Sequence, residues 1–105
     1  MNRNLGGLEG IELKTILTRT LLKFCEDHNY PPLGLTDVRQ CLEFLERRDL
    51  ESAVKAFKKV PLGGRMGYFD EWCPQPAFKH ETSEYVQVVF AAITAQWAST
   101  MKGQP

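Results

Sequence analysis

The chain has 105 residues, of which 43% are hydrophobic and 25% are charged, and its 13 basic and 13 acidic residues cancel. A chain of this size is expected to form one domain around a modest core. The neutral balance argues against nucleic acid as a partner, since nucleic-acid-binding domains are usually basic. No apolar run could span a bilayer and the first residues do not resemble a secretory signal, so we expect a cytoplasmic protein with no membrane partner.

The first predicted helix runs from Leu8 to about His28 and follows a loose tail over residues 1–7. Apolar residues recur along it at spacings of three and four, which predicts a buried face. These residues are Leu13, Ile16, Leu17, Leu21, Phe24 and Cys25. Pro31 and Pro32 end the helix, because the residue before a proline is pushed out of the α region.

Two short helices are predicted next. Thr36 is the expected N-cap of the second helix, whose apolar residues follow the i, i+3, i+4, i+7 pattern. These residues are Val38, Cys41, Leu42 and Leu45. The third helix is predicted from Asp49, and Pro61 with the glycines after it brings it to an end.

The last predicted helix is capped by Thr82 or Ser83 and runs to about Met101. It is apolar over more than half of its circumference, which predicts a central helix packed on several sides. The sequence as a whole therefore predicts an all-α, four-helix single domain over residues 1–105. Two helices are long, two are short, and a long aromatic loop rich in Gly and Pro precedes the last helix.

Charge is unevenly distributed along the chain. Residues 47–65 hold six of the 13 basic residues and two of the 13 acidic ones, so this segment carries +4 and the rest carries −4. Lys55, Lys58 and Lys59 lie opposite the apolar face of the third helix, which is typical of a solvated surface. Such polarity can influence the choice of partner.

Candidate catalytic and metal-binding groups are few. The three cysteines, Cys25, Cys41 and Cys73, form no CxxC pair, and two of them fall on predicted apolar faces, as in proteins of a reducing compartment. Neither Cys25 with His28 nor Cys73 with His80 has a recognised zinc spacing. The glycines of residues 63–67 lack the Lys-Ser/Thr pair of a P-loop. We therefore predict no metal, no cofactor and no catalytic residue.

The segment PLGGRMGYFDEWCPQP, residues 61–76, is the best candidate for a functional site. About twenty residues without helical pattern separate the last two helices, and such long connections are usually functional or disordered. Its aromatic residues argue against disorder. In one alternative Phe69, Trp72 and Phe78 fold back to seal the core. In the other, part of the segment forms an exposed contact surface, because hot spots favour Trp, Tyr and Arg. The predicted partner-binding residues are Arg65, Tyr68, Asp70, Glu71 and Trp72.

The stretches GGRMGYFDEWCP and HETSEYVQVVFAAI resemble a pattern in small, uncharacterised bacterial helical proteins. In that pattern a GGMG turn leads to an aromatic residue, an acidic residue, a Trp and a Pro, and then to a helix that opens with a Tyr. The matching positions are Gly63, Gly64, Met66, Gly67, Phe69, Trp72, Pro74, His80, Glu81 and Tyr85. Arg65 interrupts the GGMG. The resemblance covers about the last 45 residues and implies no activity.

The leading hypothesis is a non-enzymatic protein that binds another protein, most concretely a bacterial immunity or inhibitor protein that neutralises a toxin. One alternative is a small enzyme or ligand-binding domain that uses Cys73 and His80 under the loop of residues 61–78. Another is a structural or adaptor protein that forms homo-oligomers through the apolar surplus of the last helix.

Overall fold

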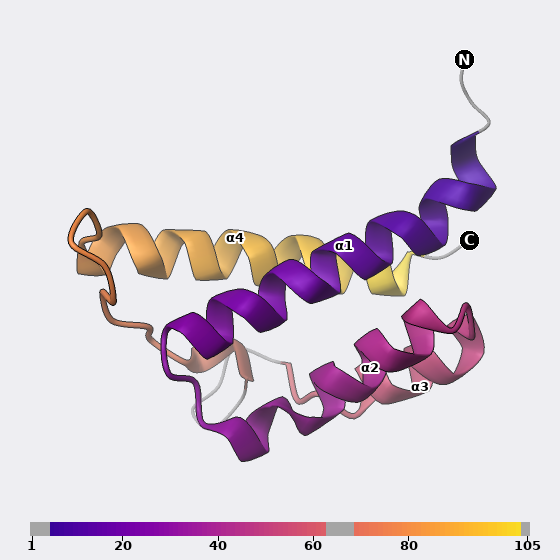
Figure 1. The fold of residues 1–105 in the computed structure, drawn as a ribbon, viewed down its shortest axis with the longest axis horizontal. Coiled ribbons are helices and arrows are strands. Elements are labelled where there is room, and N and C mark those ends of the chain that lie inside the picture. The colour runs from indigo at the N-terminus through magenta and orange to yellow at the C-terminus, as the bar shows by residue number, and fades with distance from the viewer. Residues whose placement is uncertain (1–4, 63–68, 104–105) are drawn as a thin grey trace.

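The computed structural model describes residues 5–62 and 69–103 (Figure 1). Its helices are α1 (Leu5–Asp27), α2 (Thr36–Glu46), α3 (Leu50–Lys58) and α4 (Ser83–Lys102), and its 3₁₀ turns are η1 (Pro32–Leu35) and η2 (Phe69–Glu71). The described residues contain no strand. The predicted all-α domain of two long and two short helices is confirmed, and so is the long connection before α4.

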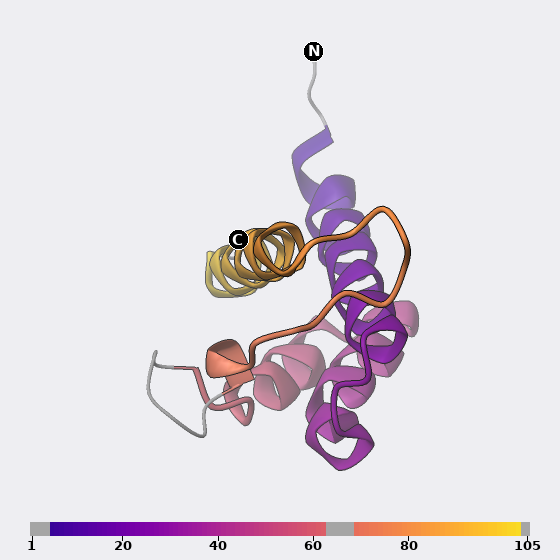
Figure 2. The same cartoon turned by 90° about the vertical axis from the view of Figure 1, so that its left-hand side faces the viewer.

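The helices form two layers. α1 and α4 run antiparallel and lie side by side, and the α2–α3 hairpin packs beneath them (Figures 1 and 2). The core lies between the layers. The segment that enters α4 passes over the end of α1, as the end-on view in Figure 2 shows. This crossing brings the loop before α4 next to the C-terminal turn of α1.

The buried stripe of α1 differs from the predicted one, because Leu13 and Ile16 are about half exposed. Leu21 and Cys25 are buried as predicted, and α1 and its C-terminal turn also bury Lys14, Thr18 and His28. The prediction counted only apolar residues. Thr18 is nevertheless satisfied inside, since its hydroxyl donates to the Lys14 carbonyl at 2.7 Å and accepts from Trp97 Nε1 at 2.9 Å.

The two ends of α1 follow different rules. The helix begins at Leu5, so it includes Gly6 and Gly7, which the sequence places in the tail. Glycine in a helix costs about 1 kcal/mol relative to alanine but does not prevent the helix. At the other end Asn29 has φ 67°, a left-handed conformation that asparagine tolerates after a helix. The turn there directs the chain into Pro31 and η1.

The caps of α2 and α3 contrast. Thr36 is the first residue of α2 and not its N-cap; the cap position is held by Leu35, and the Thr36 hydroxyl donates to the Leu33 carbonyl at 3.1 Å. The prediction failed because the preceding turn η1 already directs the chain into the helix. Asp49 caps α3, as its Oδ1 accepts from the Ser52 N–H at 3.1 Å.

One side of α4 is open, although the sequence predicts a helix packed on several sides. The residues that α4 buries are Val86, Phe90, Thr94, Trp97 and Met101. Tyr85 and Val88 are at least half exposed, because the two-layer arrangement places α1 and the hairpin on the other sides of the helix. Even so, none of the helices in the described part is long and apolar enough to cross a membrane.

Candidate functional site

Only part of the predicted contact surface falls within the described structure. Arg65 and Tyr68 lie outside the described residues. Asp70 belongs to η2, but its side chain lies outside what the structure describes. Glu71 is exposed and Trp72 is half-buried. The five-residue surface therefore stays a prediction, and Trp72 is its inward-facing member.

Phe69 of η2 and Trp72, the residue after η2, fold back onto the core. Trp72 meets Phe90 and Tyr30 edge-on, with ring centroids 5.0 Å and 4.7 Å apart. Phe69 is buried and lies 5.0 Å from Tyr30 and 5.6 Å from Phe90. These contacts seal the core beside α1 and α4, as one of the two alternatives for the loop predicts. Phe78 is the exception, because this residue is 49% exposed.

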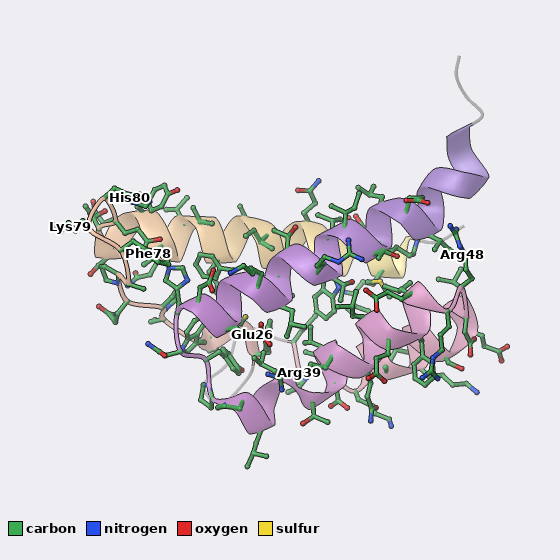
Figure 3. The ribbon with its side chains drawn as sticks, in the orientation of Figure 1. Glu26, Arg39, Arg48, Phe78, Lys79 and His80 are labelled. Atoms are coloured by element: carbon green, nitrogen blue, oxygen red, sulfur yellow. The ribbon has the colours of Figure 1, made fainter. Side chains whose placement is uncertain are left out.

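Phe78 belongs to an exposed group of rings where the loop enters α4 (Figure 3). The rings of Phe78 and His80 stack with centroids 6.2 Å apart, and His80 meets Tyr85 edge-on at 6.3 Å. Tyr85 is 50% exposed, and Lys79 projects from the same end of the molecule. We call Phe78, Lys79, His80 and Tyr85 the aromatic tip.

Glu81 holds the backbone of the aromatic tip. Its Oε1 accepts hydrogen bonds from the backbone N–H of Ala77 at 2.9 Å and from that of Phe78 at 3.1 Å. The next residue, Thr82, is the N-cap of α4 and accepts the N–H of Tyr85 at 3.1 Å, as predicted. The rings of the tip are therefore carried by a backbone that two consecutive side chains fix.

His28 binds Glu81 from the end of α1. Its Nε2 lies 3.0 Å and 3.1 Å from the two carboxylate oxygens of Glu81, and the two side chains are only 4% and 6% exposed. Its Nδ1 lies 2.8 Å from the carbonyl oxygen of Phe24, on whose ring it stacks at 4.1 Å. The Phe78 ring meets His28 edge-on at 5.8 Å. We call the His28–Glu81 pair the clasp.

The clasp is a charge-assisted contact. Both ring nitrogens of His28 face oxygen atoms, and a carbonyl or an ionised carboxylate can only accept. Burial alone would raise the pKa of Glu81, but hydrogen bonds from the Ala77 N–H, the His28 ring and the Phe78 N–H outweigh it and lower that pKa below its ordinary value. The carboxylate is thus held ionised in a nearly dry site, where it ties the loop to α1.

The sequence predicted neither half of the clasp. The sequence places His28 at the end of the first predicted helix, although Leu21, Cys25 and His28 follow the i, i+4, i+7 spacing that marks a buried stripe. Glu81 has no comparable signal. It stands in an irregular segment, and 53 residues separate it from its partner.

The alternative catalytic pair is not assembled. Cys73 Sγ donates to the Glu71 carbonyl at 3.8 Å while His80 stacks in the tip, and no hydrogen bond joins the two among the described residues. Burial raises the pKa of Cys25 and of Cys41 to about 12, so these thiols stay protonated. Within residues 5–62 and 69–103, no cluster of three His, Cys, Asp or Glu side chains could hold a metal ion.

Two shallow grooves lie elsewhere on the surface. One, of about 210 Å³, lies between α1 and the end of α2, beneath the ion pairs Arg19–Glu46 at 3.1 Å and Arg48–Glu12 at 3.2 Å. The other, of about 220 Å³, lies between α2 and α3 and is lined in part by Lys55. Both are smaller than the roughly 300 Å³ at which small-molecule pockets begin. Neither supports the ligand-binding alternative.

Comparison of the chain with protein-family models, curated proteins and solved structures gives no match. The resemblance of the loop and α4 to small bacterial helical proteins stays a prediction. Function is therefore inferred from the exposed rings and the groups that hold them.

Proposed function

We propose that this chain is a non-enzymatic protein-binding domain and that the aromatic tip is its contact surface. The observation that carries the proposal is the half-exposure of Phe78 and Tyr85 on a backbone that Glu81 and Thr82 fix. Aromatic residues are enriched at protein interfaces. Rings on a preorganised backbone also lose less conformational entropy on binding than rings on a flexible loop.

The chemistry of the tip indicates the kind of partner surface. The rings of Phe78 and Tyr85 fit an apolar pocket, whereas Lys79 and His80 add basic groups at its edge. The complementary surface is an apolar cleft flanked by acidic side chains.

The most concrete form of the proposal is a bacterial immunity or inhibitor protein that covers the active site of a toxin in the cytoplasm. A projecting group of rings suits the filling of a cleft, which supports an inhibitory role. The free thiols of Cys25, Cys41 and Cys73 favour a reducing compartment. If the partner is a toxin, producing it alone will arrest growth, and co-production of the wild-type chain but not of Phe78→Asp will restore growth.

A pull-down with the tagged full chain from cells of the source organism tests binding directly. The wild-type chain is compared with Phe78→Asp and with Leu33→Asp, a matched control on η1 where the native side chain is 91% exposed. We expect a stoichiometric partner with the wild type and with Leu33→Asp, and its loss with Phe78→Asp. A partner that Phe78→Asp retains, or no partner with any variant, would contradict the proposal.

Self-association is the second candidate, and one specific observation favours it. Leu13 and Ile16 of α1 and Val88 of α4 are exposed apolar residues on the two long helices. Such residues can pack against a second copy of the chain. Light scattering of the wild type and of Val88→Glu tests this: a dimer mass that falls to 12.0 kDa in the variant supports it, and a 12.0 kDa wild type excludes it.

A further inference from the structure

We propose that protonation of His28 controls the aromatic tip: the clasp is closed when both ring nitrogens carry a proton and opens when one proton is lost. The inference rests on the proposed function of the tip for its biological meaning. The clasp itself can be measured without any partner.

The geometry of His28 requires both protons. A neutral imidazole has one N–H, and the other nitrogen presents a lone pair. If the proton stays on Nδ1 to serve the Phe24 carbonyl at 2.8 Å, the Nε2 lone pair faces the Glu81 oxygens at 3.0 Å and 3.1 Å. If the proton moves to Nε2, the Nδ1 lone pair faces the carbonyl. Either tautomer leaves two acceptors in contact in a nearly dry site, which is unfavourable.

The charged side chains around His28 on the helices are engaged elsewhere. On α1, Lys23 pairs with Asp27 at 2.9 Å. Glu26 pairs across the turn with Arg39 of α2 at 3.1 Å (Figure 3). These pairs are more exposed than the clasp, and among the described residues none of them contacts the His28 ring.

The described residues of the loop and α4 add no second hydrogen-bond partner for His28. Lys79 and His80 are exposed, and the Phe78 ring packs on both His80 and His28. Glu84, in the first turn of α4, is exposed as well. In the part of the chain that the structure describes, Glu81 is the one charged group in hydrogen-bond contact with His28. The charge of His28 therefore acts on the tip through Glu81.

Opening of the clasp disorders the tip by a short route. Once Nε2 is deprotonated, the Glu81 carboxylate is more stable when it turns out to water, where it can accept hydrogen bonds. The backbone N–H groups of Ala77 and Phe78 then lose their acceptor. Phe78 also loses a ring against which it packs. Histidine is the side chain that changes charge between about pH 5 and 8. The tip is thus ordered on the acid side of the His28 transition and loosened as the pH rises through it.

An NMR titration of the ¹⁵N-labelled full chain from about pH 5 to about pH 9 tests the inference below the ordinary range of lysine and tyrosine. The ring nitrogens of His28 report its protonation, and the backbone amides of Ala77 and Phe78 report their hydrogen bonds to Glu81. We expect the two amides to shift upfield with the same midpoint as the His28 ring. Amides that stay fixed while His28 titrates overturn the inference.

Glu81→Gln sharpens the test. The amide oxygen of the variant can still accept from Ala77 and Phe78, while its NH₂ group can donate to the bare Nε2 of neutral His28. We expect the tip amides to stay ordered at high pH in this variant. Glu84→Gln is the matched control, since it removes one carboxylate three residues away and should keep the wild-type transition. The same transition in Glu81→Gln overturns the inference, and if that variant does not fold, the wild-type titration decides.

Binding measurements separate this inference from the proposed function. With the purified partner, wild-type affinity should fall at least about tenfold across the His28 transition, while that of Glu81→Gln should not follow it. Binding without a coupled amide transition overturns the clasp and leaves the proposed function intact. A coupled amide transition without binding at any pH overturns the proposed function and leaves the clasp intact.

Discussion

The two ends of α1 each carry an acid–base pair that joins distant parts of the chain. The clasp has an N–O distance of 3.0 Å and side chains that are 4% and 6% exposed. The Arg48–Glu12 pair, nearer the other end, has a similar distance, 3.2 Å, but side chains that are 58% and 50% exposed. The two pairs therefore differ in how deeply their side chains are buried and not in their N–O distance.

The difference has a physical cause. Water and salt compete with an exposed pair, so its net contribution is about 0–1 kcal/mol. A buried pair stabilises the fold little more than apolar residues of similar volume would. Removal of one partner is nevertheless costly, because it leaves an uncompensated polar group in the interior. The clasp end is thus where a single charge can change the conformation of the molecule, and it is also where the exposed rings gather.

Packing should differ strongly between the core beneath the clasp and the exposed groove beside α1. Phe69→Ala, beneath the clasp end, should lower the free energy of unfolding by about 3–5 kcal/mol, because Phe69 is buried among Tyr30, Phe90 and Trp97. Ile16→Ala, in the groove between the middle of α1 and the end of α2, should lower it by less than about 1 kcal/mol. Urea unfolding with equal m-values measures both. Equal losses would show that the two sites are packed alike.

The next effect compares the two carboxylates. Glu81→Ala should lower the urea midpoint more than Glu12→Ala, because it leaves the buried His28 ring and two backbone N–H groups without an acceptor. Glu12→Ala should change the free energy of unfolding by less than about 1 kcal/mol. Midpoints that shift equally would remove the distinction between the pairs.

The loss of stability at acidic pH should depend on the protonation of Glu81. Because folding lowers its pKa, Glu81 contributes stability that is fully present above its ordinary pKa of 4.5 and is lost as the pH falls through its lower value in the folded chain. The urea midpoint of Glu81→Gln should therefore decline less below pH 4.5 than that of the wild type. An identical decline would mean that the Glu81 carboxylate is not stabilised by folding.

The smallest effect concerns the thiols. Cys73 is exposed, whereas Cys25 and Cys41 are buried with their pKa raised to about 12. Iodoacetamide near neutral pH should modify Cys73 alone in the native chain and change the free energy of unfolding by less than about 0.5 kcal/mol. Mass spectrometry with peptide mapping checks this. Modification of Cys25 at a similar rate would contradict the burial of the core.

The sequence predicts those features that depend on residues close together along the chain. Thr82, one of the two predicted caps, caps α4, and Asp49, where the third helix is predicted to start, caps α3. Such caps are local, because an N-cap bonds a backbone group only three residues away. The prediction of Thr36 as an N-cap is wrong because the 3₁₀ turn before it leads directly into α2, and Leu35 holds the cap position. The spacing of apolar residues does not predict the burial of Lys14 and Thr18, since tertiary contacts bury these two polar residues. The clasp, between residues 53 apart, has no local signal that joins its two halves.

Site-specific photo-crosslinking tests whether the aromatic tip is the contact surface. A benzophenone amino acid is placed at Phe78 or, as the control, at Leu33, which is more exposed. The crosslinked protein is identified by mass spectrometry, and its binding to the purified chain is then measured with and without Phe78→Ala. We expect one partner to be captured from Phe78 and not from Leu33, and Phe78→Ala to weaken its binding by about 2 kcal/mol, roughly 30-fold. Equal capture from Leu33, or unchanged affinity of Phe78→Ala, would contradict the account.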